Sequence, residues 1–149
     1  MMPRRAAIAL FLAGCLAAGS ALALDFVSVA APSAILYDAP STKSRKMFVV
    51  SRYMPLEAVV DLQGWIKVRD SSGALAWIEK SALGNRRFVM VTAPLADVRS
   101  SPDAAAQLLF QVRQQVALEW LGDTGMGWIK VRQPDGAVGY ISADEVWGD

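Results

Sequence analysis

The residues best suited to recognition chemistry lie in a hexapeptide that the chain contains twice, Gly-Trp-Ile-Lys-Val-Arg. The first copy spans residues 64–69 and the second spans 127–132. Because alternate side chains of a strand share a face, Trp65 lies beside Lys67, and Trp128 beside Lys130. An aromatic ring next to a cation suits a ligand that carries a carboxylate. We therefore take these four residues as candidate ligand-binding residues. The alternative is that both tryptophans are structural and cover one end of each folded unit.

The residue composition of the chain excludes most kinds of catalytic site. The chain has no histidine, and Cys15 is its single cysteine. Without these side chains, Ser-His-Asp and Cys-His nucleophiles and histidine- or cysteine-based zinc sites are excluded. A paired-carboxylate glycosidase and a Ser-Lys hydrolase need neither residue, but the sequence has a motif for neither. There is no glycine-rich phosphate loop, and a unit of about 60 residues leaves little room for a substrate cleft. We expect a protein that is not an enzyme and binds neither a metal nor a cofactor.

The repeat extends well beyond the hexapeptide and divides the chain. Matching residues lie 62 positions apart from Phe26/Phe88 to Asp61/Asp123, and 63 apart from Gly64 onward. One added residue before Gly127 accounts for the change and indicates a turn, because turns tolerate insertions. We divide the chain into a leader (1–23), a first unit (24–86) and a second unit (87–149). The connection between the units is short, so we expect them to be held closely together.

The leader follows the pattern of a secretory signal peptide. Two arginines precede an apolar stretch, and small residues before Ala23 offer a cleavage position. Cleavage after Ala23 predicts an exported, periplasmic protein. Two alternatives remain open. Leu12–Cys15 resembles a bacterial lipobox, in which Cys15 would be lipidated, and the apolar run 6–24 is long enough to remain as a membrane anchor. Membrane association is expected only in these two cases.

Export changes how the charge balance is read. The 15 Lys and Arg include two in the leader, which leaves 13 against 14 Asp and Glu. A near-neutral exported chain offers no electrostatic basis for binding nucleic acid. With Cys15 removed, no disulfide forms within the chain.

Each unit has dense strand signals and weak helical ones. In the first hexapeptide, Ile66 and Val68 are expected to point inward, with the tryptophan and the cations outward. Turn sequences follow both copies at 70–73 and 133–136, so each copy begins a hairpin. Short strands, regular turns and a 60-residue span predict an all-β fold of two small, partly open barrels.

Three motifs of the second unit resemble the bacterial Src-homology-3 (SH3-like) repeat family. They are Ala96-Asp97-Val98-Arg99-Ser100-Ser101-Pro102, Gly127–Val131, and Gly136-Ala137-Val138-Gly139-Tyr140-Ile141. The first unit matches more loosely at 35–40, 64–69 and 73–78. The resemblance implies two tandem five-stranded barrels with a binding role. Bacterial members of this family often contact peptidoglycan or its peptide cross-links, and some are small exported proteins of unknown function.

The differences between the units suggest where a ligand or a partner binds. Of the aromatic residues that grip peptides in eukaryotic SH3 domains, the resemblance places Tyr37 beside Trp65 in the first unit only. Trp120 and Trp147 have no aromatic counterpart, so we assign them to the interface between units or to a partner. We expect a cell-envelope module that recognises peptidoglycan stem peptides or a short peptide. The alternative is an assembly partner that docks another envelope protein through its aromatic surface.

Overall fold

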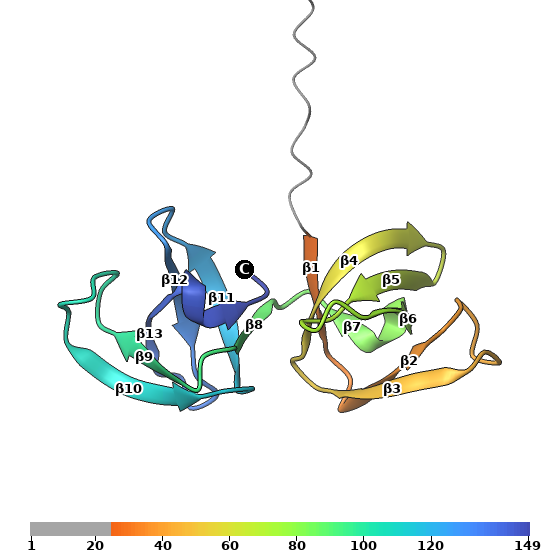
Figure 1. Ribbon diagram of the computed structural model, residues 1–149, viewed down its shortest axis with the longest axis horizontal. Helices are drawn as coiled ribbons and strands as arrows, with labels where there is room; N and C mark the ends of the chain where they lie inside the picture. The colour runs from red at the N-terminus through yellow and green to blue at the C-terminus, as the bar shows by residue number, and fades with distance from the viewer. Residues whose placement is uncertain (1–24) are drawn as a thin grey trace, which may run out of the picture.

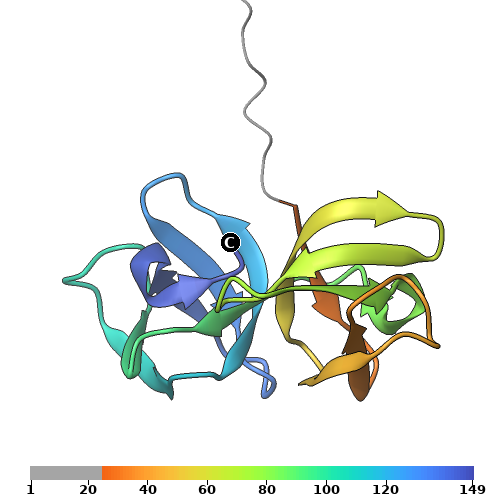
Figure 2. The same ribbon diagram turned by 45° about the vertical axis from the view of Figure 1, so that its right-hand side comes forward.

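The computed structural model describes residues 25–149, and Ala23 and Cys15 lie outside this range. The chain forms two separate antiparallel sheets, each curled into a small barrel, that lie side by side (Figure 1). The predicted pair of SH3-like barrels is therefore confirmed. Turning the molecule by 45° keeps the two barrels distinct, with the connecting segment between them (Figure 2).

The first barrel has the strand order β3-β2-β6-β5-β4-β1-β7. Its elements are β1 (Asp25–Val29), β2 (Ser33–Tyr37), β3 (Lys46–Ser51), β4 (Pro55–Leu62), β5 (Trp65–Arg69), β6 (Leu75–Glu79), the 3₁₀ turn η1 (Lys80–Ala82) and β7 (Leu83–Gly84). The second barrel repeats this order. Its elements are β8 (Phe88–Val91), β9 (Leu95–Arg99), β10 (Leu108–Arg113), β11 (Ala117–Asp123), β12 (Trp128–Arg132), β13 (Val138–Ser142), η2 (Ala143–Glu145) and β14 (Val146–Trp147).

Each sheet has seven strands rather than the expected five. The additional strands come from the two ends of each unit: β1 pairs with both β4 and β7, and β8 pairs with both β11 and β14. Pairing of the first strand with the last satisfies backbone groups that would otherwise lie unpaired at the barrel margin. The start and end of each unit are thereby held together.

The repeat is preserved down to its irregularities. A register shift between Ala58 and Val60 recurs between Trp120 and Gly122, 62 positions later. Such bulges bend and twist a strand, as a small barrel requires. The added residue of the second unit lies in the segment between β11 and β12, which confirms the turn that the change of offset predicted.

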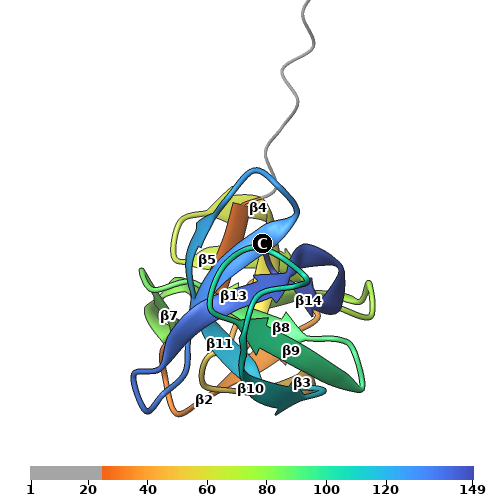
Figure 3. The same ribbon diagram turned by 90° about the vertical axis from the view of Figure 1, so that its left-hand side faces the viewer.

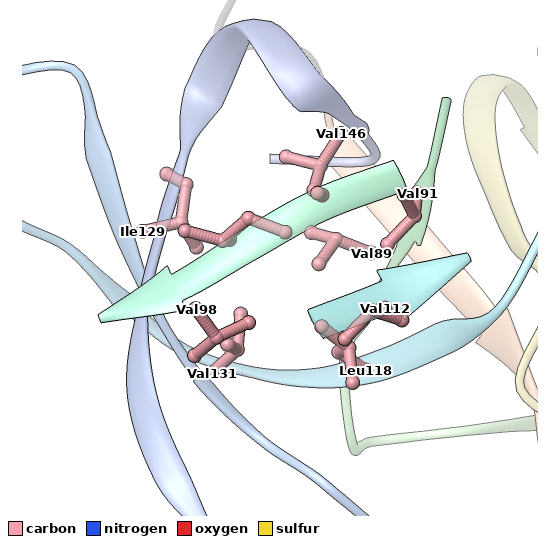
Figure 4. Close-up of a cluster of buried hydrophobic side chains, with 10 residues drawn as sticks. Val89, Val91, Val98, Val112, Leu118, Ile129, Val131 and Val146 are labelled. Carbon is pink, nitrogen blue, oxygen red and sulfur yellow. The ribbon is translucent and has the colours of Figure 1, made fainter. Parts of the chain in front are cut away.

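The alternation in the hexapeptide places its apolar residues in two equivalent cores. Ile66 and Val68 are buried in the first barrel, and Ile129 and Val131 are fully buried in the second, as predicted. The second core combines apolar side chains from all seven strands of the barrel (Figure 4): Val89, Val91, Ala96, Val98, Val112, Leu118, Ile129, Val131, Ile141 and Val146. Viewed along the long axis of the molecule, the second barrel faces the viewer, with its strands curled into a closed outline (Figure 3).

The barrels contact each other through the first-strand phenylalanine of each unit. Phe88 of the second unit stacks on Tyr53 of the first, with ring centroids 4.3 Å apart. Phe26 of the first unit packs edge-on against Trp147 of the second at 5.1 Å. The buried hydroxyl of Ser28 accepts a hydrogen bond from the Phe88 N–H at 3.0 Å. Phe26 and Phe88, which occupy matching positions in the two repeats, thus each contact the other barrel.

Candidate functional site

The outer face of the first barrel carries an aromatic cluster. Tyr37 and Trp65 meet edge-on with centroids 5.5 Å apart and an interplanar angle of 82°, and Tyr37 is paired in register with Trp77. Lys67 places its Nζ 5.9 Å from the centroid of the Trp77 ring. Only 5% of Tyr37 is exposed, so its ring supports Trp65 while Trp65 itself is partly accessible. The structure therefore brings three of the predicted residues together, and adds Trp77.

The second barrel builds the same face with different chemistry. Arg99 occupies the position of Tyr37 and pairs with Tyr140, as Tyr37 pairs with Trp77. The guanidinium of Arg99 donates to Asp97 Oδ2 at 2.7 Å and to the Ala106 carbonyl at 2.9 Å. These two bonds hold a planar cation where the first unit has a phenol.

Trp128 borders a hollow of about 390 Å³ on this face. The remaining lining comes from β9, the loop after it and the end of β13 with η2: Asp97, Arg99, Ala104, Ser142, Asp144 and Glu145. Burial raises the pKa of Glu145, and the neighbouring charge of Asp97 adds to this effect. A hollow that combines an indole ring, one guanidinium and three carboxyl groups can bind a ligand that carries both amino and carboxylate groups.

The lining of the hollow beside Trp128 differs from the aromatic and cationic face that the hexapeptide predicts. Lys130 is exposed on β12, paired with Tyr140, and does not line the hollow beside Trp128. In the first unit, Tyr37 borders a smaller hollow of about 230 Å³ that is formed mainly by β2 and the segment around Glu79 and Ala82. Sequence reasoning missed Asp97, Asp144 and Glu145, because only the fold brings β9 next to η2.

Trp120 and Trp147 both contact residues at the junction of the barrels. Trp147 packs against Phe26, as described above, while the Trp120 ring lies 4.2 Å from the guanidinium carbon of Arg87. Arg87 belongs to the linker between the barrels, the segment 85–87 between β7 and β8. It lies 5.9 Å from the Phe26 ring and donates to the Gly148 carbonyl at 3.0 Å. Among the described residues, Arg87 Nε and Trp120 Nε1 are buried without a hydrogen-bond partner. The linker arginine is thus packed between aromatic rings of both units.

The part of the chain that the structure describes contains no group of three His, Cys, Asp or Glu side chains arranged to hold a metal ion. Within residues 25–149, no helix has the length and apolar character needed to cross a membrane.

Sequence comparison agrees with the barrel geometry. Models of the bacterial SH3 domain match residues 30–84 and, separately, residues 94–146. The chain therefore belongs to the bacterial SH3 domain family and contains two tandem domains of it. Among curated proteins, none matches the sequence.

Similar solved structures include two proteins of Trichomonas vaginalis and one of Bacillus cereus. NlpC2 and NlpC1 from T. vaginalis both give a TM-score of 0.40, at 16% and 15% identity, and the similarity covers 85% and 89% of this chain. An NlpC/P60 family protein from B. cereus gives 0.38 at 15% identity and 83% coverage. The match covers 49%, 49% and 56% of those chains, so this chain spans about half of their length.

Proposed function

We propose that this protein is an exported, non-enzymatic module of the cell envelope that recognises peptidoglycan stem peptides. The observation that carries the proposal is the hollow beside Trp128, on the outer face of a bacterial SH3 domain. Stem peptides are short chains with free carboxylates and free amino groups. Both kinds of group find a partner in this hollow, at Arg99 and at the carboxyl groups around it, while the indole ring covers an apolar part of the ligand.

The chemistry of the chain supports binding rather than turnover. Its sequence contains no histidine and a single cysteine, Cys15, so the Ser-His and Cys-His nucleophile–base pairs of many hydrolases cannot form. The two SH3 domains together account for most of residues 25–149. The proposal includes export through cleavage after Ala23, with lipidation at Cys15 as the alternative that would hold the protein at the membrane.

Sedimentation with purified peptidoglycan tests the proposal. The wild-type protein is expected to sediment with the polymer, and Trp128→Ala is expected to lose at least about 2 kcal/mol of binding, the loss typical of an aromatic that dominates an interface. Trp65→Ala reports on the first unit in the same assay. Trp128→Phe is the matched control, because it keeps a ring in place. Wild-type protein that remains in the supernatant would overturn the proposal.

A second candidate function is the docking of another envelope protein. The edge strand β3 favours it, because Met47, Phe48 and Val49 are all exposed, and Val49 is 74% exposed. An apolar edge strand whose backbone groups are paired on one side only is open to strand addition by a partner. Crosslinking in intact cells separates the two functions. One dominant crosslinked protein, without sedimentation on peptidoglycan, would favour docking.

A further inference from the structure

The junction between the barrels contains two adjoining hollows, of about 250 Å³ and 190 Å³. Tyr53, Arg86 and Phe88 line both of them. The stacked pair of Tyr53 and Phe88 therefore borders both hollows. Together the hollows reach the lower part of the range of volumes typical of small-ligand sites.

The walls of this junction are held by bonds that cross it. Arg86 of the linker donates to both carboxylate oxygens of Glu119, from Nε at 2.8 Å and from Nη2 at 2.7 Å. Arg132 approaches the same carboxylate at 3.4 Å. The hydrogen bond from the Phe88 N–H to Ser28 fixes the aromatic pair against the first barrel. The site is therefore preformed, so ordering its side chains on binding would cost a ligand little free energy.

Positive charge exceeds negative charge at the junction. Arg52, Arg86 and Arg132 line the two hollows, whereas Glu119 is the one acidic residue among their lining residues. Arg52 is exposed, 6.0 Å from the Tyr53 ring, and within residues 25–149 no carboxylate lies within 4 Å of its guanidinium. Because Arg86 uses Nε and Nη2 for Glu119, its Nη1 is not engaged by this carboxylate. Asn85 adds an exposed side-chain amide to the same hollow.

We propose that this junction binds a free carboxylate group of a peptide, between Arg52 and Arg86, with the body of the peptide lying against the partly exposed Tyr53 ring. A guanidinium matches the planar geometry of a carboxylate, and the adjacent ring matches an organic chain rather than an inorganic anion. A nucleic acid is disfavoured, because the chain as a whole is nearly neutral. The inference rests on the proposed function for the source of the peptide, whether a peptidoglycan stem peptide or a segment of an envelope protein.

Titration of the purified exported protein with a small peptide tests the junction directly. The probe is N-acetyl-Ala-Glu-Ala with free carboxylates, and its uncharged counterpart is N-acetyl-Ala-Gln-Ala-amide. We expect the charged probe alone to bind, with NMR shifts centred on the amides of residues 52–53 and 84–88. Arg52→Gln should weaken binding about tenfold, the loss of one charge-assisted hydrogen bond. Arg113→Gln, an exposed arginine on β10 outside the junction, is the matched control.

The outcomes separate this inference from the proposed function. Equal affinity of wild type and Arg52→Gln, or shifts confined to the face around Trp128, would overturn the junction site, and sedimentation on peptidoglycan would still support the proposed function. If the probe binds at the junction but the protein does not sediment, the junction site stands and the peptide comes from a protein. Tyr53→Ala is a second variant of the same site and should also weaken binding of the probe. An unchanged unfolding midpoint of Arg52→Gln confirms that its loss of binding is local.

Discussion

The hydrogen bond between Ser28 and the Phe88 N–H offers a sharp test of how the two barrels are coupled. Ser28 is 2% exposed and Phe88 is 6% exposed, and the hydrogen bond between them is buried. Ser28→Ala deletes the acceptor and leaves the Phe88 N–H buried and unpaired. An orphaned donor of this kind costs about 1–3 kcal/mol of folding free energy. We expect Ser28→Ala to be destabilised by that amount, although it removes only one oxygen atom.

Guanidinium unfolding followed by tryptophan fluorescence measures this loss, because Trp147 lies at the junction. Hydrogen exchange at the Phe88 amide reports the same bond locally. Each loss of about 1.4 kcal/mol in the opening free energy accelerates exchange about tenfold. Ser51→Ala is the matched control, since Ser51 is exposed on β3 and should change stability by less than about 0.5 kcal/mol. A Ser28→Ala protein as stable as this control, with unchanged exchange at Phe88, would refute the reasoning.

Three further predictions concern other parts of the chain. Hydrogen bonding from Arg86 lowers the pKa of Glu119, so its contribution to stability is present above the unfolded pKa of about 4.3 and is lost as pH falls through the lower folded value. Urea unfolding between pH 7 and pH 3 should show a decrease in the free energy of unfolding, part of which is absent in Glu119→Gln. An identical pH profile of stability in the variant would contradict this. Gly139→Ala should destabilise the second barrel by about 1–3 kcal/mol, because a Cβ there would lie 2.5 Å from Val98 Cγ1 and 2.9 Å from the Arg99 carbonyl oxygen. Thermal unfolding measures this loss of stability, with Val138→Ala at an exposed neighbouring position as the control. Equal unfolding midpoints of the two variants would count against the packing argument. Mass spectrometry of the exported protein should give a chain that begins at Leu24, whereas a lipid adduct on Cys15 would contradict the cleavage after Ala23.

Much of the fold could be predicted because its signals are local. The alternation of Ile66 and Val68 with outward-facing residues predicts a strand with one buried face, and both residues are buried. The turn sequences at 70–73 and 133–136 predict hairpins, and β5–β6 and β12–β13 form them. The end strands β7 and β14 carry no such signal, because they are two residues long and exist through pairing with a distant strand.

The candidate site was only partly predictable. Trp65 and Tyr37 were expected together from the family resemblance, and the structure places their rings in edge-on contact. The lining of the hollow beside Trp128 has no equivalent signal, since Asp97 and Glu145 lie far apart in the chain. Their neighbourhood depends on where η2 packs, which is a property of the closed barrel.

The sequence by itself determined that one unit is used twice, that each unit is a small β-barrel, and that its hexapeptide points Ile and Val inward. These features follow from residue type and spacing along a single strand or turn. Only the tertiary structure decided that Phe26 and Phe88 each pack against an aromatic ring of the opposite barrel. It also decided that the linker residues Arg86 and Arg87 contact Glu119 and Trp120 of the second barrel. The physical reason is that these contacts join residues some 30 to 120 positions apart, whose meeting depends on how two complete barrels pack.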